Sequence, residues 1–321
     1  MLKKILCSSL AALTLFLAAS CTPINLPEES SENYSDGVIY HSVDGNASKS
    51  ENVSKIEEPS SEQSALEESS EEVSYDTELK IPTTITADSV DSFFNDGIFV
   101  GNSIMLKYEK FVSKYRTSSV SDFLGTSKFF CAGSFGVYHN NNTPADKADA
   151  VNPSYQGTKY SVQDMVGVAN PKRVFLNLAG LNDMGIFPVK SCAEDTAKEM
   201  IQIIKDIKNE HPEVEIVVLS TTYMIKRNNN MTRLNNENLS IMNNLILDYC
   251  NANGVDFVDV STLLTENGCL ADKYCSDIDS LGCHLNDSGC LVWTGILRNY
   301  AAKKLSGVYK NPQSMPSLSK G

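Results

Sequence analysis

The chain has 321 residues, of which 41% are hydrophobic and 21% charged, and its net charge at neutral pH is −13. It contains one apolar run near the N-terminus and no second run long enough to span a bilayer, which excludes a protein with several membrane spans. We expect no nucleic-acid partner.

Residues 1–21 have the order of features of a secretory signal. Lys3 and Lys4 precede an apolar stretch over residues 5–19, which is short for a transmembrane helix. The stretch closes with "LAASC", and small residues before Cys21 resemble the bacterial lipoprotein signal. This resemblance implies lipidation of Cys21 and attachment to the extracytoplasmic face of the cell membrane. The alternative is an ordinary signal peptide with a cysteine there by chance.

A Ser/Glu-rich segment follows over residues 22–82 and is predicted to be a disordered linker. Residues 22–80 contain 15 acidic residues against three lysines, so they account for most of the net charge of the chain. Such a composition buries too little apolar surface to offset the entropy of ordering. The acidity therefore says nothing about the active site.

Residues 83–309 are predicted to form one folded domain, followed by a flexible tail over residues 310–321. Short apolar runs alternate with stretches of helical spacing, and the runs are typical of parallel strands buried on both faces. The five runs are "GIFVG", "KFFCAG", "RVFLNLAG", "EIVVLSTTY" and "VDFVDV". The pattern predicts an α/β protein, a three-layer α/β/α sandwich around a parallel five-stranded sheet.

Reactive groups of such a sheet lie beyond the carboxyl ends of its strands. Ser103 follows the first strand in "GNS", Asn182 follows the third in "GLND", and the second ends in the glycine-containing "CAGSFG". Near the C-terminus, His284 precedes the last helix in "GCHLNDSG". Taken singly, each has a more ordinary interpretation: a helix cap for Ser103, a turn residue for Asn182 and a surface position for His284.

Together, in this order, the four segments resemble the blocks of the GDSL, or SGNH, hydrolase family, whose fold is flavodoxin-like. The resemblance implies that Ser103 is the nucleophile and His284 the general base. It also implies an oxyanion hole formed by the Ser103 backbone N–H, a glycine N–H and the Asn182 side-chain amide. Gly136 is favoured as the glycine, with Gly133 as the alternative. No metal or organic cofactor is expected.

Two positions depart from the family pattern. Position 102 is Asn rather than Asp, although an amide can still accept a hydrogen bond in the turn. The acid usually found three residues before the histidine is replaced by Leu281. We expect a stretched loop in which Asp279, or less favourably Asp277, orients His284. The alternatives are a backbone carbonyl in a Ser-His dyad and a loss of catalysis.

Seven cysteines lie after Cys21, so a complete set of disulfides within one chain is impossible. Four of them surround His284 in sequence without the paired spacing typical of zinc sites, and we expect no metal there. They are interpreted either as a disulfide that braces the histidine loop or as free buried thiols. These four are Cys269, Cys275, Cys283 and Cys290.

The expected function is a membrane-anchored serine esterase that hydrolyses short O-acyl esters, with acetylated glycans as the candidate substrates. Short acyl chains are expected because no long apolar lid segment separates the blocks. The alternatives are a catalytically silent glycan-binding or scaffold lipoprotein on the same fold, and a solute-binding lipoprotein.

Overall fold

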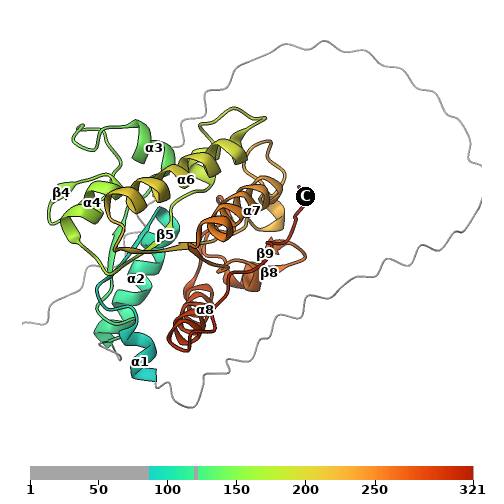
Figure 1. Cartoon of the computed structure of the whole chain (residues 1–321). Coiled ribbons are helices and arrows are strands. Elements are labelled where there is room, and N and C mark those ends of the chain that lie inside the picture. Colours follow the sequence, from blue (N-terminus) through green and yellow to red (C-terminus); the bar gives the residue numbers. More distant parts are fainter. Residues whose placement is uncertain (1–86, 119–121, 321) are drawn as a thin grey trace, which may run out of the picture. The chain divides into compact units, whose positions relative to one another are not determined.

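The central element is a five-stranded sheet in which all neighbouring strands are parallel. The computed structural model describes residues 87–118 and 122–320 (Figure 1). The predicted signal, Cys21 and the linker over residues 22–82 lie outside the described residues. The strands of the sheet are β1 (Gly97–Gly101), β2 (Lys128–Cys131), β5 (Arg173–Asn177), β6 (Glu215–Leu219) and β7 (Asp256–Val258).

The strand order is β2-β1-β5-β6-β7, so the sheet confirms the predicted parallel α/β architecture. Short two-stranded pairs lie outside it: β3 (Ser154–Tyr155) with β4 (Thr158–Lys159), and β8 (Thr265–Glu266) with β9 (Cys269–Leu270). The chain runs from β1 to β2 on one side and later adds β5 on the other side of β1. The direction of winding therefore reverses between β1 and β5, and ligands of open α/β sheets bind beyond the carboxyl ends of the strands at such a point.

Helices cover both faces of the sheet, which makes the predicted three layers. The longer helices are α2 (Ser103–Ser118), α4 (Val162–Ala169), α6 (Cys192–Glu210), α7 (Asn236–Asn253) and α8 (Asp287–Leu305). The shorter ones are α1 (Ala87–Ser92), α3 (Val137–Asn142), α5 (Leu181–Met184) and the single 3₁₀ turns η1 (Lys226–Asn228), η2 (Thr262–Leu264) and η3 (Asp272–Tyr274). Helix α6 contacts α3, α4, α5 and α7 on one face, while α8 contacts α1 and α2 on the other.

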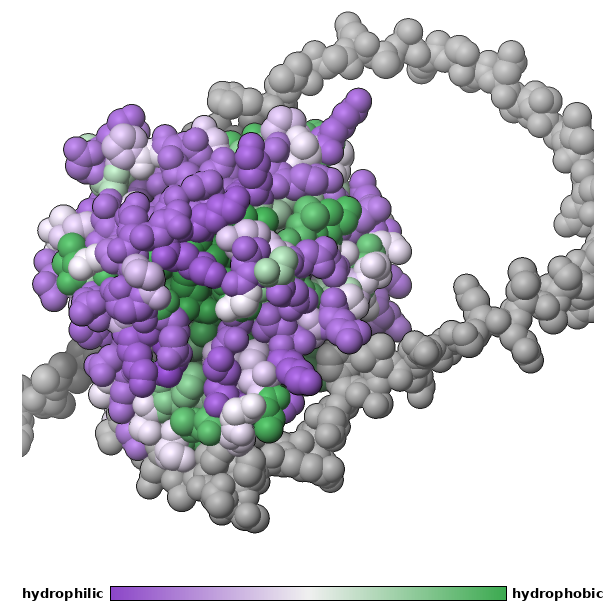
Figure 2. Space-filling view, in the orientation of Figure 1, coloured by the Kyte–Doolittle hydropathy of each residue, from purple (hydrophilic) through white to green (hydrophobic). Residues whose placement is uncertain are grey.

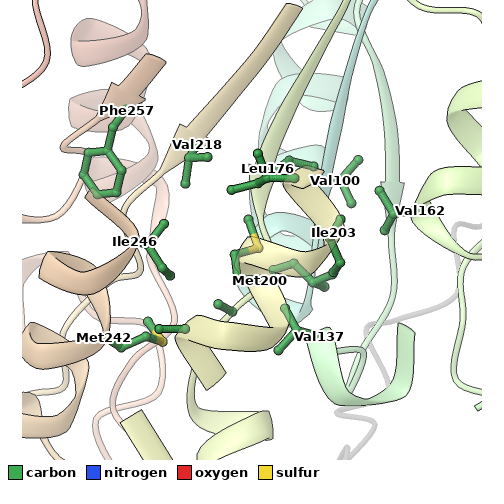
Figure 3. Close-up of a cluster of buried hydrophobic side chains, with 14 of the residues drawn as sticks. Val100, Val137, Val162, Leu176, Met200, Ile203, Val218, Met242, Ile246 and Phe257 are labelled. Carbon is green, nitrogen blue, oxygen red and sulfur yellow. The ribbon is translucent and has the colours of Figure 1, made fainter. Parts of the chain in front are cut away.

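Alternate residues of each strand point into two separate apolar cores. Val100, Leu176 and Val218 belong to the core under α6 and α7 (Figure 3), whereas Phe99 and Phe175 belong to the core under α2 and α8. The two phenylalanine rings stack at a centroid distance of 4.4 Å. Because both faces are covered, the strands lack the polar alternation of a half-exposed sheet, which is why they read as continuous apolar runs.

The outer surface of the helical layer is polar. Figure 2 shows that hydrophilic residues dominate the face on which α6 and α7 lie, with smaller hydrophobic areas between them. Helix α6 accordingly buries its apolar residues and begins with the acidic Glu194 and Asp195, as its amphipathic sequence predicts. Within residues 87–118 and 122–320, no helix is both long and apolar enough to cross a membrane.

The C-terminal segment is ordered by α7, and the prediction of a flexible tail over residues 310–321 is wrong for the part that the structure describes. The side chain of Asn244 on α7 bonds to both backbone groups of Met315, at 2.9 and 3.3 Å. Asn311 donates to the Val255 carbonyl and accepts from the Phe257 N–H. Met315 is buried in the core. The polar composition that suggested a loose tail instead supplies hydrogen bonds.

Candidate active site

Ser103 stands at a tight turn from strand to helix. Strand β1 ends at Gly101, and Ser103 is the first residue of α2, half-buried. A side chain at position 101 would place its Cβ 2.5 Å from the Cβ of Met105 and 2.7 Å from the Asn177 carbonyl oxygen. Glycine is therefore required for the helix to start so close to the sheet. At this position the backbone N–H of Ser103 is among the first of the helix, which lack partners within the helix.

Asn102 holds this turn with both ends of its amide. Its Oδ1 accepts the Ile104 N–H at 3.0 Å, which confirms that an amide can replace the carboxylate as the acceptor. Its Nδ2 donates to the Leu178 carbonyl at 3.3 Å, and the residue is buried. A carboxylate could not donate this second bond. The departure from the family pattern thus connects the Ser103 turn to the segment that follows β5.

His284 joins the serine to a carboxylate. Its Nε2 lies 2.8 Å from Ser103 Oγ, and its Nδ1 lies 2.8 Å from Asp277 Oδ2. The imidazole is buried, with a relative exposure of 7% for the residue. These contacts form one continuous hydrogen-bond chain from Asp277 to Ser103. The pattern of a nucleophile, a base and a group that orients the base is the geometric signature of an activated serine.

Backbone N–H groups of the loop before α8 hold the Asp277 carboxylate in place. Its two oxygens accept the backbone N–H groups of Gly282, Cys283 and His284 at 3.0–3.1 Å. Burial opposes ionisation of this carboxyl, but the hydrogen bonds and charge of His284 outweigh it and lower the pKa to about 2. The group is therefore a carboxylate at neutral pH, as an acceptor for the His284 Nδ1–H must be.

The prediction that Asp279 orients the histidine is wrong. The Asp279 side chain is 99% exposed and pairs with Arg227 at 3.2 Å. The loop between Asp277 and His284 is longer than the one or two inserted residues expected from the sequence, because a turn in which Ser280 N–H bonds to the Asp277 carbonyl folds back on itself. Three backbone N–H groups of this loop bond to Asp277 and close the loop, which brings the Asp277 carboxylate to the His284 imidazole.

Asn182 and Gly136 lie on two adjoining loops. Asn182 is in the first turn of α5, and its Nδ2 donates to the Phe135 carbonyl at 3.1 Å. An amide nitrogen has two hydrogens, so this bond orients the group and leaves the second N–H to donate to a substrate oxygen. Gly136 precedes α3, and a Cβ there would lie 2.2 Å from Asp183 Oδ1. A Cβ at Gly133 would meet nothing within 4 Å, so glycine is not required there for space.

Asp183 is a residue of this region to which the sequence assigned no role. It is fully buried and accepts the backbone N–H groups of Tyr138 and Gly180, at 2.9 and 3.1 Å. Burial raises the pKa of its carboxyl to about 7, against the opposing effect of these and neighbouring N–H groups. The signal available in the sequence was its place directly after Asn182, at the same edge of the sheet.

None of the seven cysteines in residues 87–118 and 122–320 is in a disulfide, so the four near His284 are buried thiols and the alternative of a disulfide brace is wrong. Ligand atoms of Asp277, Cys283 and His284 lie within 4.8 Å of one another, as three ligands of a metal would. However, Asp277 and His284 already bond to each other. Their proximity is therefore accounted for by the hydrogen-bond chain to Ser103.

The sequence model of the GDSL-like lipase/acylhydrolase family matches residues 138–290, a stretch that contains Asn182, Asp277 and His284 and begins after Ser103 and Gly136. No curated protein matches the chain.

Solved structures with a similar fold include a GDSL-like lipase from Bacteroides thetaiotaomicron, with 13% identity, covering 65% of this chain and 88% of that one, at a TM-score of 0.45. An acetyl xylan esterase matches with 17% identity over 66% of this chain and 99% of that one, at a TM-score of 0.42. The esterase EstA from a Pseudoalteromonas species matches with 9% identity over 66% of this chain and 100% of that one, at a TM-score of 0.43.

The family match covers the Asn182 motif that follows β5 and the segment around His284. The five-stranded parallel sheet is the one that the family resemblance implied. Residues 138–290 therefore form a domain of the GDSL-like lipase/acylhydrolase family, whose members act on ester bonds.

Proposed function

We propose that the protein hydrolyses short O-acyl esters with Ser103 as nucleophile, His284 as general base and Asp277 as the acid that orients the imidazole. The observation that carries this proposal is the hydrogen-bond chain from Asp277 through His284 to Ser103, with both contacts at 2.8 Å. The Ser103 hydroxyl and the Asp277 carboxylate are both at hydrogen-bond distance from His284, which is the first requirement for proton transfer.

In the proposed reaction, Ser103 Oγ attacks the ester carbonyl carbon while His284 Nε2 accepts the hydroxyl proton. Asp277 keeps the other ring nitrogen protonated and stabilises the imidazolium that forms. The same proton then passes to the alkoxy oxygen of the leaving alcohol, and an acyl-enzyme results. Water, deprotonated by His284, attacks the acyl carbonyl, and Ser103 leaves with its proton restored.

The oxyanion of each tetrahedral intermediate is proposed to accept hydrogen bonds from the Ser103 N–H, the Gly136 N–H and the Asn182 side-chain amide. Asn182 supports this role because its amide is already oriented by the Phe135 carbonyl. Removal of one such donor typically lowers kcat by about 10²–10³.

For the substrate, we propose a short acyl group, acetyl in the first instance, on a glycan outside the cytoplasmic membrane. The short chain follows from the absence of a long apolar lid segment between the sequence blocks. The location follows from the signal-like residues 1–21 and from Cys21, which we propose is lipidated. The acidic segment over residues 22–82 would then separate the enzyme from the membrane surface.

The anchor has its own test. Replacing Cys21 with Ala should abolish labelling by radioactive palmitate and move the protein from the membrane fraction to the soluble fraction, because acyl chains would be its only attachment. Continued membrane association of the unlabelled variant would refute the anchor without affecting the chemistry proposed for Ser103.

The chemistry is tested with a fluorophosphonate probe and a panel of acetylated sugars and p-nitrophenyl esters of increasing chain length. Wild type should be labelled and should hydrolyse acetyl esters fastest, whereas Ser103→Ala should do neither. Ser113→Ala is the matched control, since Ser113 is exposed on the same helix and should behave as wild type. If wild type is not labelled and hydrolyses no ester of the panel, the catalytically silent binding protein is favoured instead.

A further inference from the structure

The carboxylate of Asp183 serves two helices at once. In α5 its Oδ2 accepts the N–H of Gly180, the residue that precedes the helix, as the acidic residue of a capping box does. Its Oδ1 accepts the N–H of Tyr138 in the first turn of α3, and the Val137 N–H also contributes. Helix α3 is preceded by Gly136, which has no side chain to cap it, so Asp183, 45 positions beyond Tyr138, supplies the cap.

These contacts connect the two loops that carry the proposed oxyanion donors. Gly136 lies directly before the capped N–H groups, and its Cα packs against the carboxylate so closely that a Cβ would lie 2.2 Å from Oδ1. Asn182 is the residue next to Asp183 and bonds to Phe135, the residue next to Gly136. Asn182 bonds to the residue before Gly136, and Asp183 bonds to a residue shortly after it. These two contacts therefore fix the spacing between the Gly136 N–H and the Asn182 amide.

We propose that Asp183 is a positioning residue of the oxyanion hole, which holds the loop of Gly136 and the turn of Asn182 at the separation that a tetrahedral intermediate requires. This inference rests on the proposed function and adds to it a residue that does not touch the substrate.

The nature of the side chain supports a role beyond filling space. Asp183 is completely buried, and burying a carboxyl in a protein interior is costly unless it is well hydrogen-bonded. Helix α5 has only four residues and α3 only six, so neither is stable by itself. A single acceptor with two oxygens can satisfy N–H groups from both helices, which an apolar side chain of similar volume cannot do.

The test compares Asp183→Asn with wild type in steady-state hydrolysis of p-nitrophenyl acetate by the full chain. An amide of the same size offers one acceptor oxygen and turns an NH₂ group toward the N–H of Tyr138 or Gly180, so one loop must move. We expect kcat to fall about 10–100-fold while KM changes less than about threefold, since part of one donor's contribution is lost in the transition state.

Asp91→Asn is the matched control. Asp91 is also a buried carboxylate, paired with Arg298 at 2.6 Å, but it lies in α1, which leads into the amino end of β1. It should lower the melting temperature and leave kcat within twofold. A kcat of wild-type size in a folded Asp183→Asn variant would overturn the proposal. Absence of ester turnover in wild type would instead overturn the proposed function, and with it the role of Asp183.

A second variant applies if Asp183→Asn does not fold. Gly136→Ala retains the carboxylate but presses a Cβ against it, and it should give the same loss of kcat together with slower labelling of Ser103 by fluorophosphonate, whose phosphoryl oxygen occupies the oxyanion hole. Wild-type values for both rates in Gly136→Ala would overturn the proposal. In addition, the raised pKa of Asp183 means that the folded state loses stability as pH rises from about 4 to 7. A folded Asp183→Asn variant should lack this component.

Discussion

Asp277 and Asp279 are two acids two positions apart, and at the scale of single residues they should behave differently. Asp277→Asn leaves a side chain of the same size but removes the carboxylate that bonds to His284 Nδ1. We expect kcat to fall by about 10³–10⁴, because the equivalent change in a well-studied serine protease costs about 10⁴. Asp279→Asn changes an exposed side chain and should retain wild-type kcat. Steady-state kinetics of both variants, with circular dichroism to verify folding, separates the two assignments.

The same carboxylate should make stability depend on acid pH. The pKa of Asp277 is lowered to about 2 in the folded state, below the ordinary value of 3.8. A group with a depressed folded pKa stabilises the protein above its unfolded pKa, and this contribution is lost as pH falls from about 4 to 2. The difference in free energy of unfolding between wild type and Asp277→Asn should therefore shrink over that range. Urea titrations followed by fluorescence of Trp293, the single tryptophan, would measure it. A constant difference would contradict the assigned pKa.

At the scale of elements, the segment that follows α8 is part of the fold because α7 presents asparagines to it. Asn244 bonds to Met315 in both directions, and Asn251 donates to the Pro312 carbonyl at 3.2 Å. These side-chain amides substitute for the backbone partners that an extended strand would have in a sheet. The segment thereby closes one edge of the core under α7.

Met315→Ala should consequently destabilise the protein by about 2–5 kcal/mol, the range for truncating a buried large aliphatic side chain. Gln313→Ala is the control from the same segment, since Gln313 is exposed and should change stability by less than about 0.5 kcal/mol. Chemical denaturation of both variants measures the difference. Equal free energies of unfolding for the two variants would indicate instead that the C-terminal segment is a loose tail.

At the scale of the whole molecule, the described part of the chain is held together without covalent cross-links. Six of its seven cysteines are buried and the seventh, Cys131, is half-buried, all as thiols. Burial raises the pKa of Cys250, Cys275 and Cys290 to about 12, so thiolates are scarce near neutral pH.

Reducing agent should therefore leave the melting temperature unchanged. A chain that begins at Thr22 should react with Ellman's reagent at no more than one thiol rapidly when native, and at seven thiols in denaturant. Fewer than seven thiols in denaturant without reductant would reveal a disulfide. A melting temperature that falls on reduction would show in addition that the disulfide stabilises the fold.

Local pattern in the amino-acid sequence was sufficient for the strands and the long helices, and the order of four short segments was sufficient for three of the candidate site residues. Buried strands require apolar runs and long helices require amphipathic spacing, so both can be predicted from residues that are close together in the sequence. Ser103 and Asn182 could be found because each follows a strand whose end must lie at the carboxyl edge of a parallel sheet, and His284 because it precedes the last helix in a segment that resembles the family's histidine block. Gly136 was favoured over Gly133 by the family resemblance, and the structure adds a physical reason for glycine there, the contact with Asp183.

Tertiary structure alone decided which acid faces His284, what Asp183 does and where the C-terminal segment lies. Each depends on hydrogen bonds between residues that are not neighbours in an element: a loop closed by three N–H groups on Asp277, two helix starts joined by Asp183, and an α7 asparagine facing Met315. The sequence shows which side chains can donate or accept hydrogen bonds, but several acids and asparagines are equally suitable as the partner of a given group. The partner is selected only when the chain folds, because burial makes every unsatisfied polar group costly and leaves one pairing that satisfies them together.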